Sequence, residues 1–269
     1  MRASDSDSVL DPASILGQLG PLASTFALQV RDECPSTNGV LMDAPPPDDS
    51  RVHVVVAERQ TAGRGRRGRQ WQSWPSGSLT FSALWRFAPG APVPAGLSLV
   101  AGLAVVRAFE SLGVQGLQLK WPNDVLVNGH KLAGILVELQ PGRGRTPAAV
   151  IGIGVNLRLP PDVHIPDQPA VTDLAHHLEV VPTRSALLAL LLRELHALFE
   201  TYAAAGFSAL RGAWQQRNAF ADLPVTISGE GDSLSGICVG VDDDGALLVR
   251  TVDGTQRILS GEVSLRAAT

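Results

Sequence analysis

The sequence predicts an α+β protein in which helices pack on a mixed β-sheet, followed by a small antiparallel β-barrel. Three observations support this prediction. Apolar residues make up 45% of the 269 residues, which is enough for a large core. β-branched runs and segments with helical apolar spacing are interspersed through residues 1–218. After residue 218 the chain changes to short apolar runs separated by Asp-Gly turns, which is typical of a compact barrel.

The elements of the larger part follow from these patterns in chain order. Runs of β-branched residues bounded by polar ones predict strands, and apolar residues spaced three or four apart predict helices. Asn128-Gly129 lies between two apolar runs, which is a strong hairpin signal. The expected strands cover residues 52–57, 79–87, 117–120, 125–127, 132–139 and 150–157, and the expected helices cover residues 15–19, 97–112, 187–199 and 209–217.

The chain is expected to divide into three regions. Residues 1–23 form a loose arm that includes the first short helix, residues 24–218 form the large domain, and residues 219–269 form the barrel. The barrel strands are expected at residues 225–227, 236–241, 246–251 and 257–259. A barrel of this size is marginally stable alone, so we expect it to pack against the large domain.

The composition argues against several classes of protein. A formal net charge of -4 and a pI near 5.8 disfavour general nucleic-acid binding. Apolar stretches such as residues 186–192 fall short of the roughly 20 residues that a membrane helix needs. No basic segment leads into an apolar run at the N-terminus, which argues against a signal peptide. Two distant cysteines predict reduced thiols in a cytoplasmic protein.

Residues 63–69 read GRGRRGR, and we call them the arginine loop. Bulk charge cannot explain four arginines at one place in an acidic chain. Guanidinium groups bind phosphate through two hydrogen bonds, and glycines let the backbone come close to a ligand. We therefore expect an anion-binding loop that is mobile without ligand and ordered with it. The alternative is a solvated linker.

Four polar clusters stand at the ends of the expected strands. They are Ser36-Thr37-Asn38, Gln60, the sequence KWPND at residues 120–124, and Lys131 followed by Gly134. Buried or half-buried polar groups need partners, and a bound ligand can be one. Each cluster also has a structural alternative. Ser36 can cap a helix, the lysines can lie on the surface, and Asp124 can cap a turn.

Together these motifs resemble those of biotin protein ligases. The resemblance rests on the arginine loop with Trp71 behind it, on residues 120–124 and 131–138, on GIGVN at residues 152–156, and on GEVSLR at residues 261–266. It runs from residue 24 to the C-terminus. It implies a catalytic domain with the fold of the class II aminoacyl-tRNA synthetases and a C-terminal barrel of the SH3-like type.

The resemblance also implies a reaction. Biotin and ATP first form biotinyl-5'-AMP with release of pyrophosphate, and a lysine of a carrier protein then takes the biotinyl group. Biotin's carboxylate and the α-phosphate are both anions, so cations must offset the cost of bringing them together. Arg66 and Lys131 are the implied catalytic residues. Mg²⁺ is expected with the ATP phosphates, and Asp124 is either a metal ligand, a ribose contact or a structural residue.

Two overlapping sets of contacts follow from the resemblance. Short polar groups suit the neutral ureido ring of biotin, which offers N–H donors and a carbonyl. The expected biotin contacts are Ser36, Thr37, Asn38, Gln60, Arg64, Gly65, Arg66, Lys131 and Gly134. The expected contacts to ATP or the adenylate are Arg64, Arg66, Arg69, Trp71, Asn123, Asp124, Lys131, Asn156 and Arg266. Arg266 suits the exposed end of a strand equally well. The loop at residues 160–170 is a further candidate to cover the adenine.

The implied partner is the biotin carboxyl carrier protein or domain of acetyl-CoA carboxylase or a related carboxylase. We expect it to dock on an exposed strand edge, which a homodimer could also use. Too few residues precede the catalytic region for a DNA-binding domain, so we expect no repressor role and no nucleic-acid partner. Because the apolar stretches are short, we also expect no membrane partner. Two alternatives remain: a lipoate ligase or octanoyl transferase of similar fold, and a nucleic-acid-binding repressor.

Overall fold

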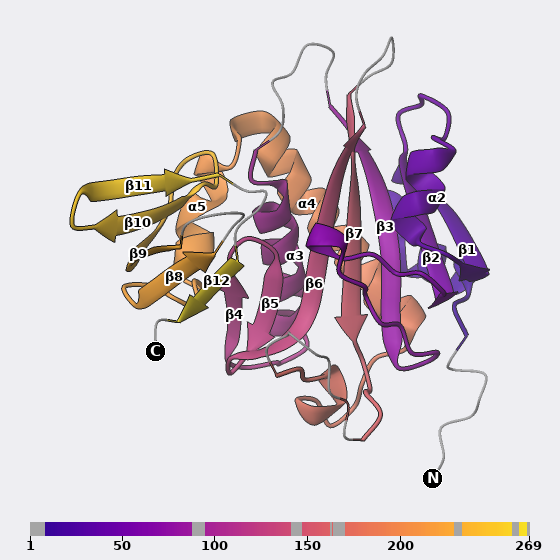
Figure 1. Cartoon of the computed structure of the whole chain (residues 1–269). Helices are drawn as coiled ribbons and strands as arrows, with labels where there is room; N and C mark the ends of the chain where they lie inside the picture. The colour runs from indigo at the N-terminus through magenta and orange to yellow at the C-terminus, as the bar shows by residue number, and fades with distance from the viewer. Residues whose placement is uncertain are drawn as a thin grey trace.

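The computed structural model describes residues 9–87, 95–140, 147–161, 163, 170–228 and 233–259, and the backbone of residues 264–267. Its strands form two sheets, with helices packed mainly against the larger sheet (Figure 1). Within the described ranges, no helix combines the length and the apolar character that crossing a membrane requires.

The larger sheet has seven strands in the order β1-β2-β3-β7-β6-β5-β4. β1 and β2 pair in parallel, and every other neighbouring pair is antiparallel. The sheet is therefore mixed, as the sequence predicts. Its strands are β1 (Phe26–Cys34), β2 (Val52–Gln60), β3 (Ser78–Arg86), β4 (Leu117–Lys120), β5 (Asp124–Val127), β6 (His130–Gln140) and β7 (Ala148–Asn156).

The helices divide between the two faces of this sheet. α3 (Leu97–Ser111) and α4 (Arg184–Ala205) cover one face, and α1 (Pro12–Leu19) packs on α4. α2 (Thr37–Asp43) covers part of the opposite face, where Leu41 meets an apolar cluster of β2, β3 and β7. α5 (Ser208–Gln215) leads to the second sheet. Short 3-10 turns lie at η2 (Gly20–Thr25), η3 (Arg66–Gly68) and η4 (Leu174–His176).

The central strands β3 and β7 show how the two faces differ. Successive side chains of a strand point to opposite faces, so every second residue shares a surface. On one face these residues are large and apolar and join the helices in the main core. On the other face they are apolar only beneath α2, at Leu84 and Val150, and elsewhere they are small or polar, which leaves space above the strands. The core-facing residues include Leu79, Phe81, Ile151 and Ile153, and those opposite include Thr80, Ser82, Gly152 and Gly154.

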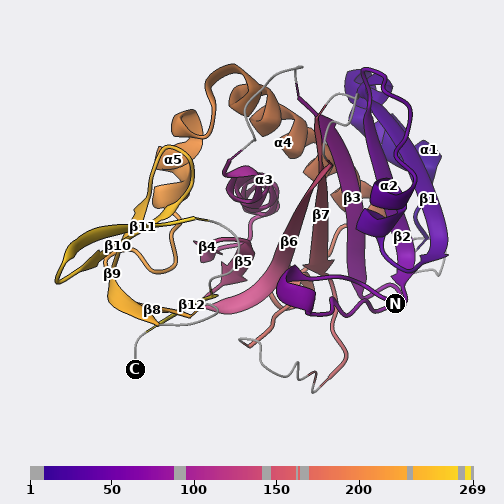
Figure 2. The ribbon, with the colours of Figure 1, turned by 45° about the horizontal axis from the view of Figure 1, so that its top comes forward.

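The second sheet has five strands in the order β11-β10-β9-β8-β12. All of its neighbouring strands are antiparallel. Figure 2 shows this sheet beside α5 and next to β4 and β5. Its strands are β8 (Pro224–Ser228), β9 (Leu234–Val241), β10 (Leu247–Thr251), β11 (Gly254–Ile258) and β12 (Ser264–Ala267).

Two expectations near the N-terminus need correction. The loose arm is wrong for residues 9–23, because Ile15 and Leu19 are buried and α1 packs on α4. Asp11 caps α1 by accepting hydrogen bonds from the backbone N–H groups of Ala13 and Ser14. Strand β1 was not expected, because polar residues interrupt its apolar pattern. Residues 1–8 lie outside the described ranges, and the domain boundary after residue 218 stays a prediction.

Candidate active site

A cleft of about 400 Å³ opens on the face of the large sheet opposite α3 and α4. Figures 1 and 2 show the arginine loop, with its short helical turn η3, crossing this face over β6 and β7. Thirteen of the predicted site residues line the cleft. Those that line it are Ser36, Thr37, Asn38, Gln60, Arg64, Gly65, Arg66, Arg69, Trp71, Asn123, Asp124, Lys131 and Gly134.

Glycines form part of the cleft floor because neighbouring side chains occupy the space of a Cβ atom. A Cβ on Gly152 would lie 2.2 Å from Asn38 Oδ1. A Cβ on Gly154 would lie 2.3 Å from the Trp71 ring. Both distances are far below van der Waals contact, so any larger residue would displace Asn38 or Trp71. Because the glycines lack side chains, these two groups can lie directly on the sheet.

One end of the cleft carries neutral hydrogen-bonding groups. Gln60 Oε1 accepts from the backbone N–H of Thr37 at 2.8 Å and from its hydroxyl at 3.1 Å. Ser82 Oγ lies 2.7 Å from Thr37 Oγ1 and 2.5 Å from Asn38 Oδ1. Ser36 caps α2, accepting from the N–H of Gly39 at 3.4 Å, so its predicted capping role is confirmed. Buried side chains in a connected network hold fixed orientations.

The arginine loop is folded as a narrow hairpin. The N–H of Trp71 donates to Gly63 O at 2.9 Å, and the N–H of Gly65 donates to Arg69 O at 2.7 Å. A Cβ on Gly63 would lie 2.4 Å from Trp71 O, so the close backbone pairing requires glycine there. These bonds fix the loop across the sheet and place its guanidinium groups at the cleft.

The other end of the cleft is cationic. Lys131 Nζ lies 2.8 Å from Asp124 Oδ1, and both side chains are largely buried. Nζ is also 5.9 Å from the centroid of the Trp71 ring. Arg66 Nη1 donates to Asn123 Oδ1 at 3.3 Å, and Asn123 Nδ2 donates to Ile135 O at 2.9 Å. Asn123 and Asp124 thus hold the two cations that the sequence singles out.

Burial lowers the pKa of the Arg66 guanidinium, while the nearby Asp124 carboxylate acts in the opposite direction. An arginine stays protonated at neutral pH even so, because its ordinary pKa is far above 7. A positive charge held in a partly dry cleft attracts an anion more strongly than one in bulk water.

Glu138 is a functional residue that the sequence-based site set does not include. It forms an ion pair with Arg64, and its Oε2 accepts from Asn38 Nδ2 at 2.8 Å. It therefore connects the arginine loop to the neutral end of the cleft. A signal was present: Glu138 is the one charged residue in the apolar run at residues 132–139, on the same face as Gly134 by the two-residue period.

We expect Glu138→Gln to loosen the arginine loop. Glutamine keeps the shape and an acceptor for Asn38 but removes the charge that pairs with Arg64. The ion pair is partly exposed, so its loss should weaken the loop only modestly. Trypsin should therefore cut within residues 63–69 about fivefold faster, as followed by mass spectrometry. Glu33→Gln is the matched control, since Glu33 on β1 pairs with Arg59 on β2 and so leaves the arginine loop untouched. Equal cleavage rates in both variants would contradict the role of Glu138.

Two predicted residues remain. Asn156 is buried, and its Nδ2 donates to Thr172 O at 3.0 Å and to Lys131 O at 3.4 Å. It thus braces the strand that carries Lys131. The backbone of Arg266 pairs with Thr226, but its side chain lies outside the described part of the chain. In the 160–170 loop, residues 162 and 164–169 also lie outside it.

Two buried donors near the cleft have no hydrogen-bond partner within the described part of the chain: Trp71 Nε1 and Thr80 Oγ1. Buried polar atoms are nearly always paired in native proteins. Both residues line the cleft, so a ligand there could supply the missing partners.

Comparison with known proteins agrees with this geometry. Residues 35–156 match the Biotin/lipoate A/B protein ligase family, and residues 224–266 match the biotin protein ligase C terminal domain. The fold and the site therefore define a ligase of the biotin and lipoate class. A solved biotin protein ligase from Aquifex aeolicus in complex with biotin and ATP superposes with a TM-score of 0.78 at 30% identity, covering 90% of this chain and 99% of that chain.

Two relatives narrow the class to one family. The biotin–[acetyl-CoA-carboxylase] ligase of Paracoccus denitrificans is 38% identical over 219 residues, covering 78% of this chain and 88% of that protein. The ligase of the same name from Mycobacterium tuberculosis is 34% identical over 262 residues, covering 94% and 95%. The chain belongs to the biotin protein ligase family.

Proposed function

We propose that this protein activates biotin with ATP and transfers the biotinyl group to a lysine of a carrier protein. The observation that carries the proposal is the polarity of the cleft. Neutral groups gather over β2 and β3, whereas Lys131 and Asp124 lie on β6 and β5, on the other side of β7. Biotin has the same division, with a neutral ureido ring at one end and a carboxylate at the other. The names of the relatives and the Aquifex complex support this assignment.

The neutral end suits the ureido ring. Thr37, Asn38 and Gln60 together offer hydroxyl and amide groups for its N–H donors and its carbonyl. Ser36 precedes them in the chain and also lines the cleft. The remaining proposed biotin contacts are Arg64, Gly65, Arg66, Lys131 and Gly134. Gly152 lets the Asn38 amide lie directly on the sheet, where it can face the ring.

The cationic end suits the activation step. A carboxylate oxygen of biotin attacks the α-phosphorus of ATP, the bond from that phosphorus to the bridging oxygen breaks, and pyrophosphate leaves with the electron pair. Negative charge accumulates on the α-phosphate as the new bond forms. Arg66 and Lys131 are held ready beside this point by Asn123 and Asp124, so little reorganisation is needed when the charge develops.

The remaining proposed contacts concern the nucleotide. Arg64 and Arg69 add positive charge near the phosphates, although Arg64 is already paired with Glu138. Trp71 offers an aromatic face for the adenine. Asn156 and Arg266 stay in the proposed set of nucleotide contacts.

The site also fits Mg²⁺ that arrives with ATP. Mg²⁺ prefers oxygen ligands and commonly uses one or two carboxylates together with substrate phosphates. Asp124 is the one carboxylate among the cleft-lining residues of the described ranges, so it would hold the ion. The ion would offset part of the phosphate charge.

In the second step a carrier lysine attacks the acyl carbon of the adenylate, and AMP leaves. The relatives' names point to the biotin carrier of acetyl-CoA carboxylase as the partner. β1 is an edge strand of the large sheet, and we propose it as the docking edge for the carrier or for a second copy of the chain. We propose a cytoplasmic location, which agrees with two cysteines that are free and buried.

Mass spectrometry of a carrier domain tests the proposal. The protein is incubated with the carrier domain, ATP, Mg²⁺ and biotin, and parallel samples lack ATP or contain lipoate in place of biotin. We expect the carrier to gain one biotinyl group only with biotin and ATP together. Modification with lipoate and not with biotin would refute the assignment in favour of a lipoate ligase.

A further inference from the structure

The cleft-lining residue Trp121 is bonded to the second sheet. Its side chain is 1% exposed, and Trp121 is the second residue of the segment 120–124. Its Nε1–H donates to the carbonyl oxygen of Gly245 at 3.0 Å, in a fully buried hydrogen bond. A buried donor left without a partner is costly, so Trp121 keeps its position only while Gly245 keeps its own.

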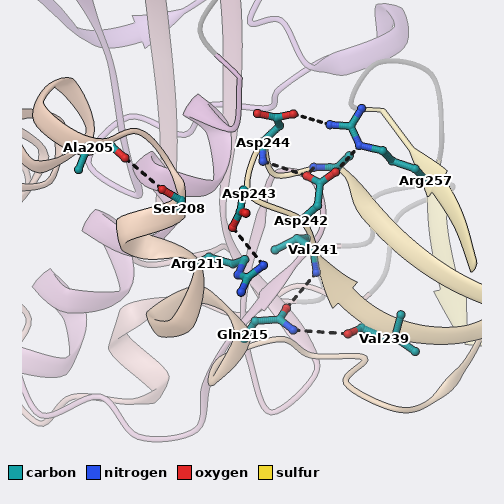
Figure 3. A network of polar contacts seen from close by, with 11 residues as sticks. Ala205, Ser208, Arg211, Gln215, Val239, Val241, Asp242, Asp243, Asp244 and Arg257 are labelled. Atoms are coloured by element: carbon teal, nitrogen blue, oxygen red, sulfur yellow. Dashed lines mark hydrogen bonds and ion pairs between the residues drawn. The ribbon is translucent and has the colours of Figure 1, made fainter.

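Gly245 belongs to the turn between β9 and β10, residues 242–246, which we call the aspartate turn. Asp242 Oδ1 accepts from the N–H groups of Asp244 and Ala246, both at 2.9 Å. Arg257 of β11 forms ion pairs with Asp242 and Asp244, and Arg211 of α5 pairs with Asp243 at 3.0 Å (Figure 3). These arginines offset the repulsion among three adjacent carboxylates and so hold the turn in one shape.

The aspartate turn is also held against the large domain. Gln215 of α5 lies between two residues of β9, accepting from Val241 N at 3.1 Å and donating to Val239 O at 3.5 Å (Figure 3). A Cβ on Gly245 would lie 2.9 Å from Gly96 Cα, so the turn touches the start of α3. Its place relative to Trp121 is therefore fixed from several sides.

The segment that carries Trp121 serves one end of the cleft. Asn123 bonds Arg66, and Asp124 pairs with Lys131, so both cations depend on residues 120–124. Thr37 and Gln60 are held by α2 and β2 and make none of these contacts. A shift of the aspartate turn would therefore disturb the cationic end and spare the neutral end.

We propose that the aspartate turn positions the cationic half of the active site through the bond between Trp121 and Gly245. By fixing Trp121, the second sheet sets the places of Asn123 and Asp124, and with them those of Arg66 and Lys131. Arg257 is thus a positioning residue for adenylate formation, although it lies on the far side of the turn. This inference rests on the proposed biotin ligase function.

Three variants test the coupling. Arg257→Gln removes both ion pairs from the aspartate turn. Arg250→Gln, the matched control, removes an exposed arginine from the neighbouring strand β10. Trp121→Phe removes the indole N–H while keeping an aromatic ring, and it identifies the Trp121 indole signal in spectra of ¹⁵N-labelled protein. The measurements are hydrogen exchange at that indole, the single-turnover rate of adenylate formation, and biotin affinity by calorimetry without ATP.

We expect Arg257→Gln to speed hydrogen exchange at the Trp121 indole and to slow adenylate formation, each by about fivefold to tenfold. Trp121→Phe should slow adenylate formation to a similar degree. Biotin affinity should fall much less than the rate in both variants, since the neutral end that holds the ureido ring is spared and only contacts to the carboxylate are weakened. Arg250→Gln should change none of these quantities.

If the wild type is active but Arg257→Gln leaves hydrogen exchange at the Trp121 indole unchanged, the proposed coupling is wrong and the proposed function still stands. Equal effects of Arg250→Gln, or a loss of biotin affinity as large as the loss of rate, would also overturn it, because the effect would then be general loosening. A wild-type protein that forms no adenylate would instead overturn the proposed function itself.

Discussion

Lys131→Met is expected to slow adenylate formation by about 10²–10³-fold. Methionine keeps an unbranched apolar side chain of similar length but removes the ammonium charge. Lys131 Nζ lies at the cationic end of the cleft, beside Asp124 and the Trp71 ring. The charge that develops on the α-phosphate would then lack one of its two preorganised partners. Single-turnover measurements with biotin and ATP give the rate directly.

A second variant separates this effect from a loss of stability. Lys131→Met leaves the Asp124 carboxylate largely buried without its cation, which should cost about 3 kcal/mol of unfolding free energy. The double variant Lys131→Met/Asp124→Asn removes that orphan charge, so its melting temperature should recover, while its rate of adenylate formation should stay well below that of Asp124→Asn alone. If activity returned together with the melting temperature, Lys131 would be a structural residue and not a catalytic one.

Much of the fold could be predicted because it depends on local patterns. Asn128 and Gly129 both adopt positive φ, 49° and 82°, as a tight hairpin turn between β5 and β6 requires. The apolar spacing predicted helices at residues 97–112 and 187–199. Helix α3 has nearly the predicted ends, whereas α4 extends beyond the predicted segment at both ends. In these segments the local preference and the buried face agree.

Strand β1 could not be predicted because its environment is set from outside the segment. Arg31 and Glu33 interrupt its apolar pattern, and the strand lies at the sheet edge with one neighbour, β2. An edge strand needs fewer apolar residues than a central one, so its sequence carries a weaker signal. A helix was expected at the position of α1, but its packing was not, because its burial depends on α4, far along the chain.

The site shows the same limit. Charged and amide groups within apolar strands indicated only that these motifs need partners. The resemblance to biotin protein ligases assigned them to one site. Their pairing could not be predicted. The ion pair of Glu138 with Arg64 and the bond of Trp121 with Gly245 join residues that are distant in sequence, and no spacing rule connects them. Such contacts depend on the sheet order and on the seating of the second sheet.

Arg66→Gln is expected to release biotinyl-5'-AMP at least about tenfold faster than wild type, because a charge-assisted hydrogen bond is worth about 1.5–3 kcal/mol. The backbone bonds of the arginine loop do not involve this side chain, so the loop should still fold across the sheet. What is lost is the positive charge that Asn123 aims into the cleft. Preloaded enzyme freed of excess nucleotide and followed by rapid filtration gives the release rate.

Arg67→Gln is the matched control for this prediction. It removes the same charge from the adjacent residue, whose side chain is exposed and whose backbone φ is 59°. If the net charge of the loop alone retained the adenylate, both variants would release it equally fast, which would contradict the role of Arg66. If the geometry set by Asn123 matters, only Arg66→Gln should leak. The comparison therefore distinguishes a general electrostatic field from one placed cation, which is the distinction on which preorganised charge stabilisation depends.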